Sequence, residues 1–295
     1  MDSKEKLLLG FEDYLLLENG LSELSIRAYT SDISLFLDFV EREFHEIEVG
    51  VCQIEAYLKE CTEHAPSSLA RFLCSLRSFC HFLKKEKLIE TDPCVHIENP
   101  KLIRHVPEVM SEQCVNAFLN APDLSCHAGA RDKAMLETIY ATGLRVSELI
   151  ALKFDNINFT DGFILIRGKG DKERLVPLCQ EAIYWIEYYL SGFRKEKDPK
   201  RKCPYVFLSG KGVNAMTRIA FWYRIKKYCE TLGITQDISP HTFRHAFATH
   251  LLNHDADLRS VQMLLGHSSL TTTQIYTHVA TRRMHQVYDK SHPRS

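Results

Sequence analysis

Apolar residues in the first part of the chain recur at three- and four-residue steps. Two segments carry the repeat, with these apolar positions: Leu24, Tyr29, Ile33, Phe36, Leu37 and Val40, then Leu69, Leu73, Leu76, Phe79, Phe82 and Leu83. This spacing is typical of helices with one buried face. Pro66 suits the start of the second helix, and Asp92-Pro93 follows its end. The pattern predicts a small bundle of four or five helices.

The periodicity stops between residues 99 and 113, where two prolines and several basic residues occur. Such a composition is typical of an extended linker. A chain of 295 residues is also long for a single hydrophobic core. The sequence therefore predicts two domains, at residues 1–98 and 111–295, joined by a linker at 99–110.

One clear pair of strands follows the linker. The strings "FILIR" and "RLVPL" flank the turn "GKGDKE", whose glycines can adopt positive φ. They predict a β-hairpin within otherwise helical sequence. The expected fold class is mainly α with a small antiparallel β-sheet in the C-terminal domain.

Charge is unevenly distributed along a chain of ordinary composition. Apolar residues make up 45% and charged residues 25%, which argues against disorder. Residues 1–104 contain 12 Lys and Arg against 19 Asp and Glu, whereas residues 105–295 contain 25 against 19. The C-terminal part is thus the better candidate for binding a polyanion, with ordinary variation in surface charge as the alternative.

The ten cysteines are scattered and include no CxxC pair. Acidic residues interrupt the apolar run of the N-terminal "MDSKEKLLLGFEDYLLL", so this segment resembles neither a signal peptide nor a membrane span. No other segment is long and apolar enough to cross a bilayer. We expect a cytoplasmic protein without membrane insertion, whose thiols stay reduced.

A cationic cluster occurs where a helix is predicted to begin. The string "SPHTFRHAFATH" starts at Ser239, a suitable N-cap, and Pro240 suits the first helical position. Three side chains then share one face near the N-terminus: His241, Arg244 and His245. A helix N-terminus beside an arginine favours a phosphate. The opposite face is predicted to be buried through Phe243, Phe247 and Leu251.

Two alternatives compete with a phosphate site. His241 and His245 have the i, i+4 spacing of the zinc motif HExxH, but no glutamate follows His241 and no third ligand is evident. Histidines that only cap and pack the helix are the second alternative. The segment on its own does not decide between them.

Further candidates lie on both sides of this cluster. Upstream, in "YATGLRVSELIALK", Arg145 follows a Thr-Gly break at the start of a predicted helix whose apolar side holds Leu149 and Leu152. Downstream, "LRSVQMLLGHSSLTTTQIYTHV" contains a short amphipathic helix, then His267, then a second helix start with Tyr276 one turn in.

The order of these residues resembles that of the tyrosine recombinases. Six strings resemble their Xer branch along nearly the whole chain: "LSELSIRAYTSDI", "ARFLCSLRSFCHFLKKEK", "ATGLRVSEL", "GKGDKERLVPL", "HTFRHAFATHLL" and "LGHSSLTTTQIYTHV". The resemblance implies a two-domain C-shaped clamp with a SAM-like core-binding domain and a catalytic domain. It also implies a catalytic set of Arg145, Lys169, His241, Arg244, His267 and Tyr276. His245 lies outside this set.

The resemblance implies two sequential transesterifications through a 3′-phosphotyrosyl link and a Holliday junction. Tyr276 would be the nucleophile, and a neutral phenol, with a pKa of about 10, needs a stabilised transition state. Arg145 and Arg244 would bind the nonbridging phosphate oxygens.

The other three residues would handle protons and hydrogen bonds. His241 would be a general acid and base, and His267 a hydrogen-bond donor to the phosphate. Lys169 would protonate the departing 5′ oxygen, although "GKGDKE" alone favours a solvated turn lysine.

The partners are also implied by the resemblance. They are double-stranded DNA with a dif-like site, a XerC-like recombinase in a heterotetramer, and an FtsK-like septal DNA translocase, in the resolution of chromosome dimers during cell division. Residues 277–295 would dock into a neighbouring protomer. No metal or other cofactor is implied. In the N-terminal domain, Arg71 and Arg77 are weak candidates for DNA contacts.

Other functions share parts of this pattern. A phage- or integron-type integrase, or a type IB topoisomerase-like strand transferase, would use similar chemistry, although a topoisomerase needs no partner duplex. A catalytically idle architectural DNA-binding protein is the non-enzymatic alternative. Covalent trapping on nicked DNA distinguishes it from the enzymes.

Overall fold

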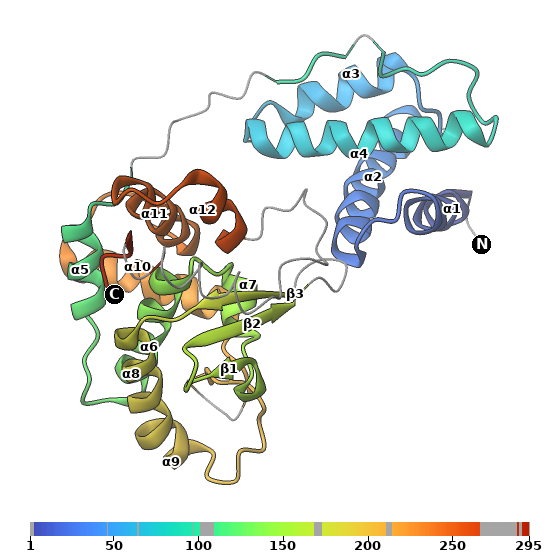
Figure 1. The fold of residues 1–295 in the computed structure, drawn as a ribbon. Coiled ribbons are helices and arrows are strands. Elements are labelled where there is room, and N and C mark those ends of the chain that lie inside the picture. The colour runs from blue at the N-terminus through green and yellow to red at the C-terminus, as the bar shows by residue number, and fades with distance from the viewer. Residues whose placement is uncertain are drawn as a thin grey trace. The chain divides into compact units, whose positions relative to one another are not determined.

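The structure is a computed structural model, and its described residues fall into two compact units, Met1–Val106 and Pro107–Ser295 (Figure 1). The described residues are 3–45, 47–63, 65–95, 97–100, 109–167, 173–210, 214–265, 288 and 291–294. The division between the units falls inside the predicted linker. Met110, at the end of that linker, is buried in the core of the second unit, where its carbonyl accepts a hydrogen bond from His250 Nε2 at 2.8 Å.

The described part of the first unit is helical. It contains four α-helices and a 3-10 turn: α1 (Ser3–Leu17), α2 (Glu23–Phe44), α3 (Val51–Glu60), η1 (Cys61–Glu63) and α4 (Pro66–Lys85). Ser22 caps α2, because its side-chain oxygen accepts the Ser25 N–H. Pro66 occupies the first turn of α4, as predicted.

The core of this unit lies between α2 and α4. Ile33, Phe36, Leu37 and Val40 are fully buried, and they pack in one cluster with the α4 side chains Leu73, Leu76, Phe79, Phe82 and Leu83. Burial of each side chain of this size contributes about 1.5–3 kcal/mol to the free energy of folding.

One predicted core position of α2 is wrong. Leu24 is 70% exposed, and Ile26 is buried in its place. Leu24 precedes Ile33 by nine residues, which is about half a turn out of phase in a helix with 3.6 residues per turn. Ile26 precedes it by seven residues and therefore lies on the buried face.

The second unit contains the remaining elements: α5 (Glu112–Asn120), α6 (His127–Thr142), α7 (Val146–Ile150), η2 (Phe154–Asn156), β1 (Ile157–Asn158), β2 (Phe163–Arg167), β3 (Glu173–Pro177), α8 (Gln180–Tyr189), the π-helical turn η3 (Leu190–Arg194), α9 (Lys195–Lys197), α10 (Arg218–Leu232), α11 (Pro240–Asn253) and α12 (Leu258–Leu265). Nowhere in the described parts of either unit is a helix both long enough and apolar enough to span a membrane.

The predicted hairpin is confirmed as part of a three-stranded antiparallel sheet of order β1-β2-β3. Leu165 pairs with Leu175 in β2 and β3. The edge strand β1 was not predicted, because two residues are too few to show an alternating pattern. The turn at 168–172, which includes Lys169, lies outside the described residues.

Helix α6 runs through the core of the second unit and contacts α8, α11 and α5. Every residue from Gly129 to Thr142 is buried. Its charged side chains are therefore paired, in the ion pairs Arg131–Asp132, Lys133–Glu137 and Arg224–Asp132. The helix ends at Gly143, two residues before Arg145, so the core directly positions the candidate site.

Candidate active site

The start of α11 agrees with the sequence prediction. Ser239 is the N-cap in extended conformation, with φ −140° and ψ 170°, and Pro240 is the first helical residue. The Ser239 N–H donates to Thr242 Oγ1 at 3.0 Å. The predicted apolar face is confirmed, since Phe243, Phe247 and Leu251 are fully buried.

The polar face of α11 carries the predicted cations. His241 and His245 are exposed, whereas Arg244 is partly buried. In the described part of the chain, the group of potential metal ligands is Cys80, Asp92 and Cys94 in the first unit. That group includes neither histidine of α11.

Two backbone carbonyls at the ends of other elements hold Arg244. Its Nη1 donates to the carbonyl of Gly143, which follows α6. Its Nη2 donates at 2.6 Å to the carbonyl of Leu265, which is the last residue of α12. Carbonyls at helix C-termini carry partial negative charge and favour a cation. Arg244 thus links three helices at a single point.

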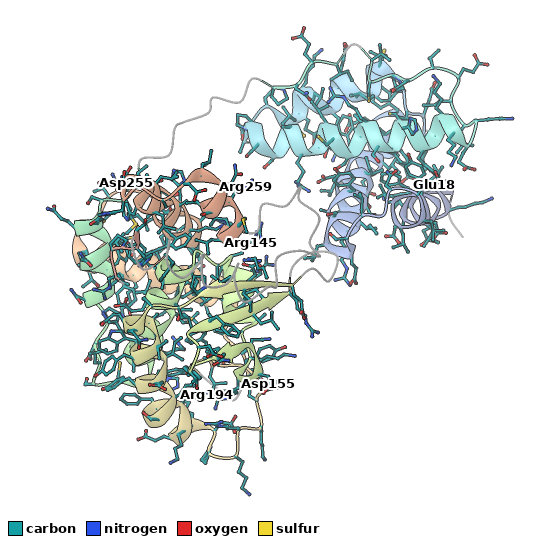
Figure 2. All side chains as sticks on the ribbon, in the orientation of Figure 1. Glu18, Arg145, Asp155, Arg194, Asp255 and Arg259 are labelled. Carbon is teal, nitrogen blue, oxygen red and sulfur yellow. The ribbon has the colours of Figure 1, made fainter. Side chains whose placement is uncertain are left out.

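Arg145 is the N-cap of α7, with its side chain 42% exposed (Figure 2). Its backbone N–H donates to Glu148 Oε2 at 2.8 Å, and its Nη1 donates to Glu148 Oε1 at 3.1 Å. The predicted helix is shorter than expected, because α7 ends at Ile150 and the buried Leu152 follows it.

Glu148 also binds a second arginine, which the sequence analysis did not identify. Arg174 from β3 donates Nη1 and Nη2 to the two Glu148 oxygens at 2.9 and 2.8 Å. Burial acts to raise the Glu148 pKa, but the hydrogen bonds and charge of Arg174, with those of Arg145, outweigh burial and hold this pKa below its ordinary value. The sequence did contain a signal for Glu148, because Arg145 and Glu148 have the spacing of an N-cap residue and the third helical residue.

The charge of Arg145 acts on Arg244. Burial, and next the positive charge of Arg145, lower the pKa of Arg244 to about 10, while Glu148 opposes this shift. Arg244 therefore remains protonated at neutral pH. Of the six predicted catalytic residues, the structure brings together Arg145 and Arg244, and it places His241 on the same helix as Arg244. Lys169, His267 and Tyr276 lie outside the described residues.

The described part of the C-terminal segment contacts its own unit next to this site. Tyr288 is fully buried and donates its hydroxyl to the Ala141 carbonyl at 2.9 Å, and Arg294 pairs with Glu137. The pKa of His292 is lowered to about 4, and burial is the largest cause of this shift. His292 Nε2 donates to the Tyr140 carbonyl at 3.3 Å. These contacts are all made with the C-terminal half of α6.

Substituting Gly143 by alanine is expected to destabilise the second unit. Gly143 has φ 59°, and an added Cβ would lie 2.3 Å from Phe247 Cδ1 and 3.1 Å from Leu265 Cδ2. The positive φ and the crowding together are expected to lower the free energy of unfolding by about 2–4 kcal/mol. The Gly143 carbonyl that holds Arg244 would also shift.

Urea unfolding followed by tryptophan fluorescence measures this effect, because both tryptophans, Trp185 and Trp222, belong to the second unit. Gly233→Ala is the matched control, since Gly233 ends α10 with φ 65° but has no atom within 4 Å of the added Cβ. It should lose only about 1 kcal/mol. Equal losses in the two variants would contradict the predicted crowding.

Replacing Glu148 by alanine is expected to cost about 3–5 kcal/mol of unfolding free energy, because it leaves Arg174 buried without its carboxylate. The side chains of Glu148 and Arg174 are only 10% and 14% exposed. Asp237→Ala is the control, because Asp237 pairs with Lys226 but is 93% exposed, and such pairs contribute about 0–1 kcal/mol.

The loss in Glu148→Ala should depend on pH. Folding lowers the Glu148 pKa, so its stabilisation is complete above the ordinary carboxyl pKa of about 4.3 and is lost as the pH falls through the lower folded-state pKa. The difference in unfolding free energy between wild type and variant should be constant near neutral pH and shrink in acid. A difference that grows in acid would contradict the ion-pair interpretation.

Comparisons with known proteins identify the family of the chain. Residues 108–283 match the phage integrase family, and residues 8–87 match the phage integrase N-terminal SAM-like domain. The chain is 46% identical to the tyrosine recombinase XerD of Pseudomonas putida and 46% identical to that of Shewanella oneidensis, in each case over 98% of this chain and 97% of the relative.

Solved structures show the same fold. A crystal structure of the XerH site-specific recombinase bound to palindromic difH substrate, in a post-cleavage complex, is similar with a TM-score of 0.73 and 21% identity, and the match covers 97% of this chain and 96% of that one. The chain therefore belongs to the phage integrase family, that is, to the tyrosine recombinases, which are DNA strand transferases, and within them to the Xer branch.

Proposed function

We propose that this chain cuts and rejoins DNA at a dif-like site through Tyr276, and so resolves chromosome dimers during cell division. The observation that carries the proposal is the pair of guanidinium groups of Arg145 and Arg244. Each is held by hydrogen bonds to the protein, and they come from different helices of one unit. Two fixed guanidinium groups suit a phosphate whose charge increases in the transition state.

Arg145 is the better placed of the two to bind a phosphate oxygen directly. Its side chain is 42% exposed, and Glu148 accepts from only one of its terminal nitrogens. Glu148 and Arg174 then act as positioning residues, because they fix the guanidinium without neutralising the site. One carboxylate against three arginines leaves a net positive charge for the phosphate.

The roles of the remaining residues follow from the chemistry of the reaction. The Tyr276 oxygen attacks phosphorus, the 5′ oxygen leaves, and Lys169 protonates it. His241, which is exposed on α11, serves as a general acid and base, and His267 donates a hydrogen bond to the phosphate. The 5′ hydroxyl of a partner duplex then attacks the phosphotyrosyl link and releases Tyr276. No phosphate ester bond is hydrolysed, because each one that breaks is replaced by another, so the reaction needs no external energy source.

We propose double-stranded DNA as the substrate and a XerC-like recombinase as the partner in a heterotetramer, with activation by an FtsK-like translocase in the cytoplasm. Similarity to relatives named XerD supports the choice. Residues 277–295 would dock into a neighbouring protomer. Because Tyr288 and Arg294 bind α6 of their own unit here, docking would replace these contacts with equivalent ones.

Basic residues of the first unit would add phosphate contacts. Arg71 is the stronger candidate, because its side chain is 51% exposed even though it pairs with Asp32 at 2.8 Å. Arg77 is the weaker one, since it donates to the Ile97 carbonyl at 2.8 Å and to Asn99 at 2.7 Å. Such contacts should weaken with salt.

A suicide substrate tests the proposal. The wild-type protein is incubated with a nicked duplex that carries a dif-like site, with and without a XerC-like partner, and the products are separated on a denaturing gel. We expect a covalent protein–DNA band, in which the nucleotide maps to the peptide containing Tyr276. Binding without any covalent band would favour the architectural alternative. Relaxed but never exchanged DNA would favour a topoisomerase-like activity.

A further inference from the structure

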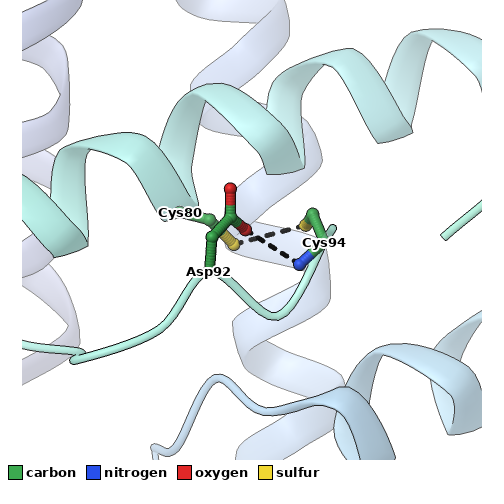
Figure 3. A group of neighbouring side chains, drawn as sticks. All are labelled: Cys80, Asp92 and Cys94. Carbon is green, nitrogen blue, oxygen red and sulfur yellow. Dashed lines mark hydrogen bonds between the residues drawn. The ribbon is translucent and has the colours of Figure 1, made fainter. Parts of the chain in front are cut away.

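A pair of thiols in the first unit lies outside the site described above. Cys80 is on α4 and Cys94 follows that helix by nine residues, yet their sulfur atoms are 3.4 Å apart (Figure 3). Both side chains are buried, at 0% and 4% exposed. We propose that Cys80 and Cys94 are a modification site at which hydrogen peroxide forms a reversible disulfide.

The backbone around Cys94 fixes its side chain against α4. Asp92 Oδ1 accepts the Cys94 N–H at 2.8 Å, and the Cys94 carbonyl accepts the Ile97 N–H at 3.1 Å. Arg77, three residues before Cys80 on the same face of α4, donates to the Ile97 carbonyl at 2.8 Å. The segment that carries Cys94 is therefore tied to the helix on which Cys80 lies.

The contacts of the two sulfur atoms assign them different roles. The two sulfur atoms share a hydrogen bond in which either thiol can donate, and this hydrogen bond, with the positive charge of Arg77, holds the Cys94 pKa below its ordinary value although burial acts against it. The Cys80 pKa is raised, first by the same hydrogen bond and then by burial. Cys94 is therefore the nucleophile, because the thiolate and not the thiol reacts.

The oxidation balances with one peroxide molecule. The Cys94 thiolate attacks one peroxide oxygen, the O–O bond breaks, and hydroxide leaves, which produces a sulfenic acid on Cys94. The Cys80 thiol gives its proton to hydroxide and its sulfur attacks the sulfenic sulfur. The S–O bond breaks, and a second hydroxide leaves and takes up the proton that Cys94 released when it ionised, which gives water. Two thiols and one peroxide become one disulfide and two waters, and a thiol reductant reverses the change.

A metal ion suits this group of three residues less well than a disulfide does. Single ligand atoms of Cys80, Asp92 and Cys94 lie within 4.8 Å of one another, but Asp92 Oδ1 already accepts the Cys94 N–H. Structural zinc sites take four ligands, and this group offers three at most. To form a disulfide, the two sulfur atoms would approach from 3.4 Å to about 2.05 Å.

Peptide mapping of the full-length protein tests the site. The reduced protein is treated with a few equivalents of hydrogen peroxide, its remaining thiols are alkylated in denaturant, and it is digested with trypsin without reduction. We expect peptides 78–84 and 88–101 to appear as one linked species, two hydrogen atoms lighter than their sum, in more than half of the molecules. Dithiothreitol should separate them completely.

Single substitutions distinguish this pair from general thiol oxidation. Cys80→Ser and Cys94→Ser should each abolish the linked species, whereas Cys52→Ser and Cys74→Ser, at exposed positions, should leave its yield unchanged. Alkylated Cys80 and Cys94 after peroxide treatment would overturn the proposal, as would links to other cysteines. If the wild-type protein contained one equivalent of zinc and Cys94→Ser contained none, the group would be a metal site and the proposal would be wrong.

Discussion

The Tyr276→Phe variant is expected to form no covalent complex with nicked site DNA and to bind that DNA as tightly as the wild type. The substitution removes only the phenolic oxygen, which is the atom that would bond to phosphorus. Most of the binding free energy should come from phosphate contacts of basic side chains, which the variant retains. Denaturing gels measure the covalent band, and gel shifts at fixed salt measure binding.

Any covalent band that Tyr276→Phe retains would assign the nucleophile to another residue. Tyr223 is the matched control, because it is a 63% exposed tyrosine in the same unit that the proposal does not use. Tyr223→Phe should form the covalent complex at the wild-type rate. A loss in both variants would indicate a general effect of removing a tyrosine hydroxyl.

The Arg244→Ala variant is expected to cleave bound DNA on the order of a hundred- to a thousandfold more slowly than the wild type. The guanidinium would stabilise charge that develops on the phosphate, and deletion of one such donor has an effect of this size in other enzymes. Lysine should rescue little, because its single ammonium cannot reach the carbonyls of Gly143 and Leu265 and a phosphate oxygen together. Single-turnover cleavage at saturating protein measures the rate.

Arg244 also links the ends of two helices, so a folding effect has to be separated from chemistry. His245→Ala is the control on the same helix, because His245 is exposed and lies outside the predicted set; it should cleave at nearly the wild-type rate. Unfolding of Arg244→Ala in urea shows how much of the chain is folded under assay conditions. A rate within tenfold of wild type, in a folded variant, would contradict the proposed role.

Local patterns predicted the start of α11 fully and the site only in part. Ser239, Pro240 and the buried face through Phe243 could be read from spacing, because capping and helical periodicity act over a few residues. Arg145 and Arg244 were identified by motif, 99 positions apart in the chain. The effect of Arg145 on the pKa of Arg244 required coordinates, because it depends on how α7 and α11 pack.

Contacts between distant segments account for what the sequence analysis missed. Arg174 is 26 residues from Glu148, and a spacing pattern within one helix cannot show that a strand brings it there. Cys80 and Cys94 have no motif spacing, yet the turn after α4 returns the chain to the same helix. The sequence analysis placed Leu24 in the core because Leu24 is apolar, and it did not take into account on which side of the helix Leu24 lies.

The amino-acid sequence by itself determined the family, the helical and hairpin segments and the identity of six candidate catalytic residues, because these depend on local propensity and on motifs. Only the tertiary structure decided that Glu148 joins Arg145 to Arg174, that the carbonyls of two helix ends hold Arg244, and that two thiols meet beside α4. Those contacts join residues that are distant in the chain. They form because burial of the shared cores brings together groups whose charges and hydrogen bonds must then be satisfied.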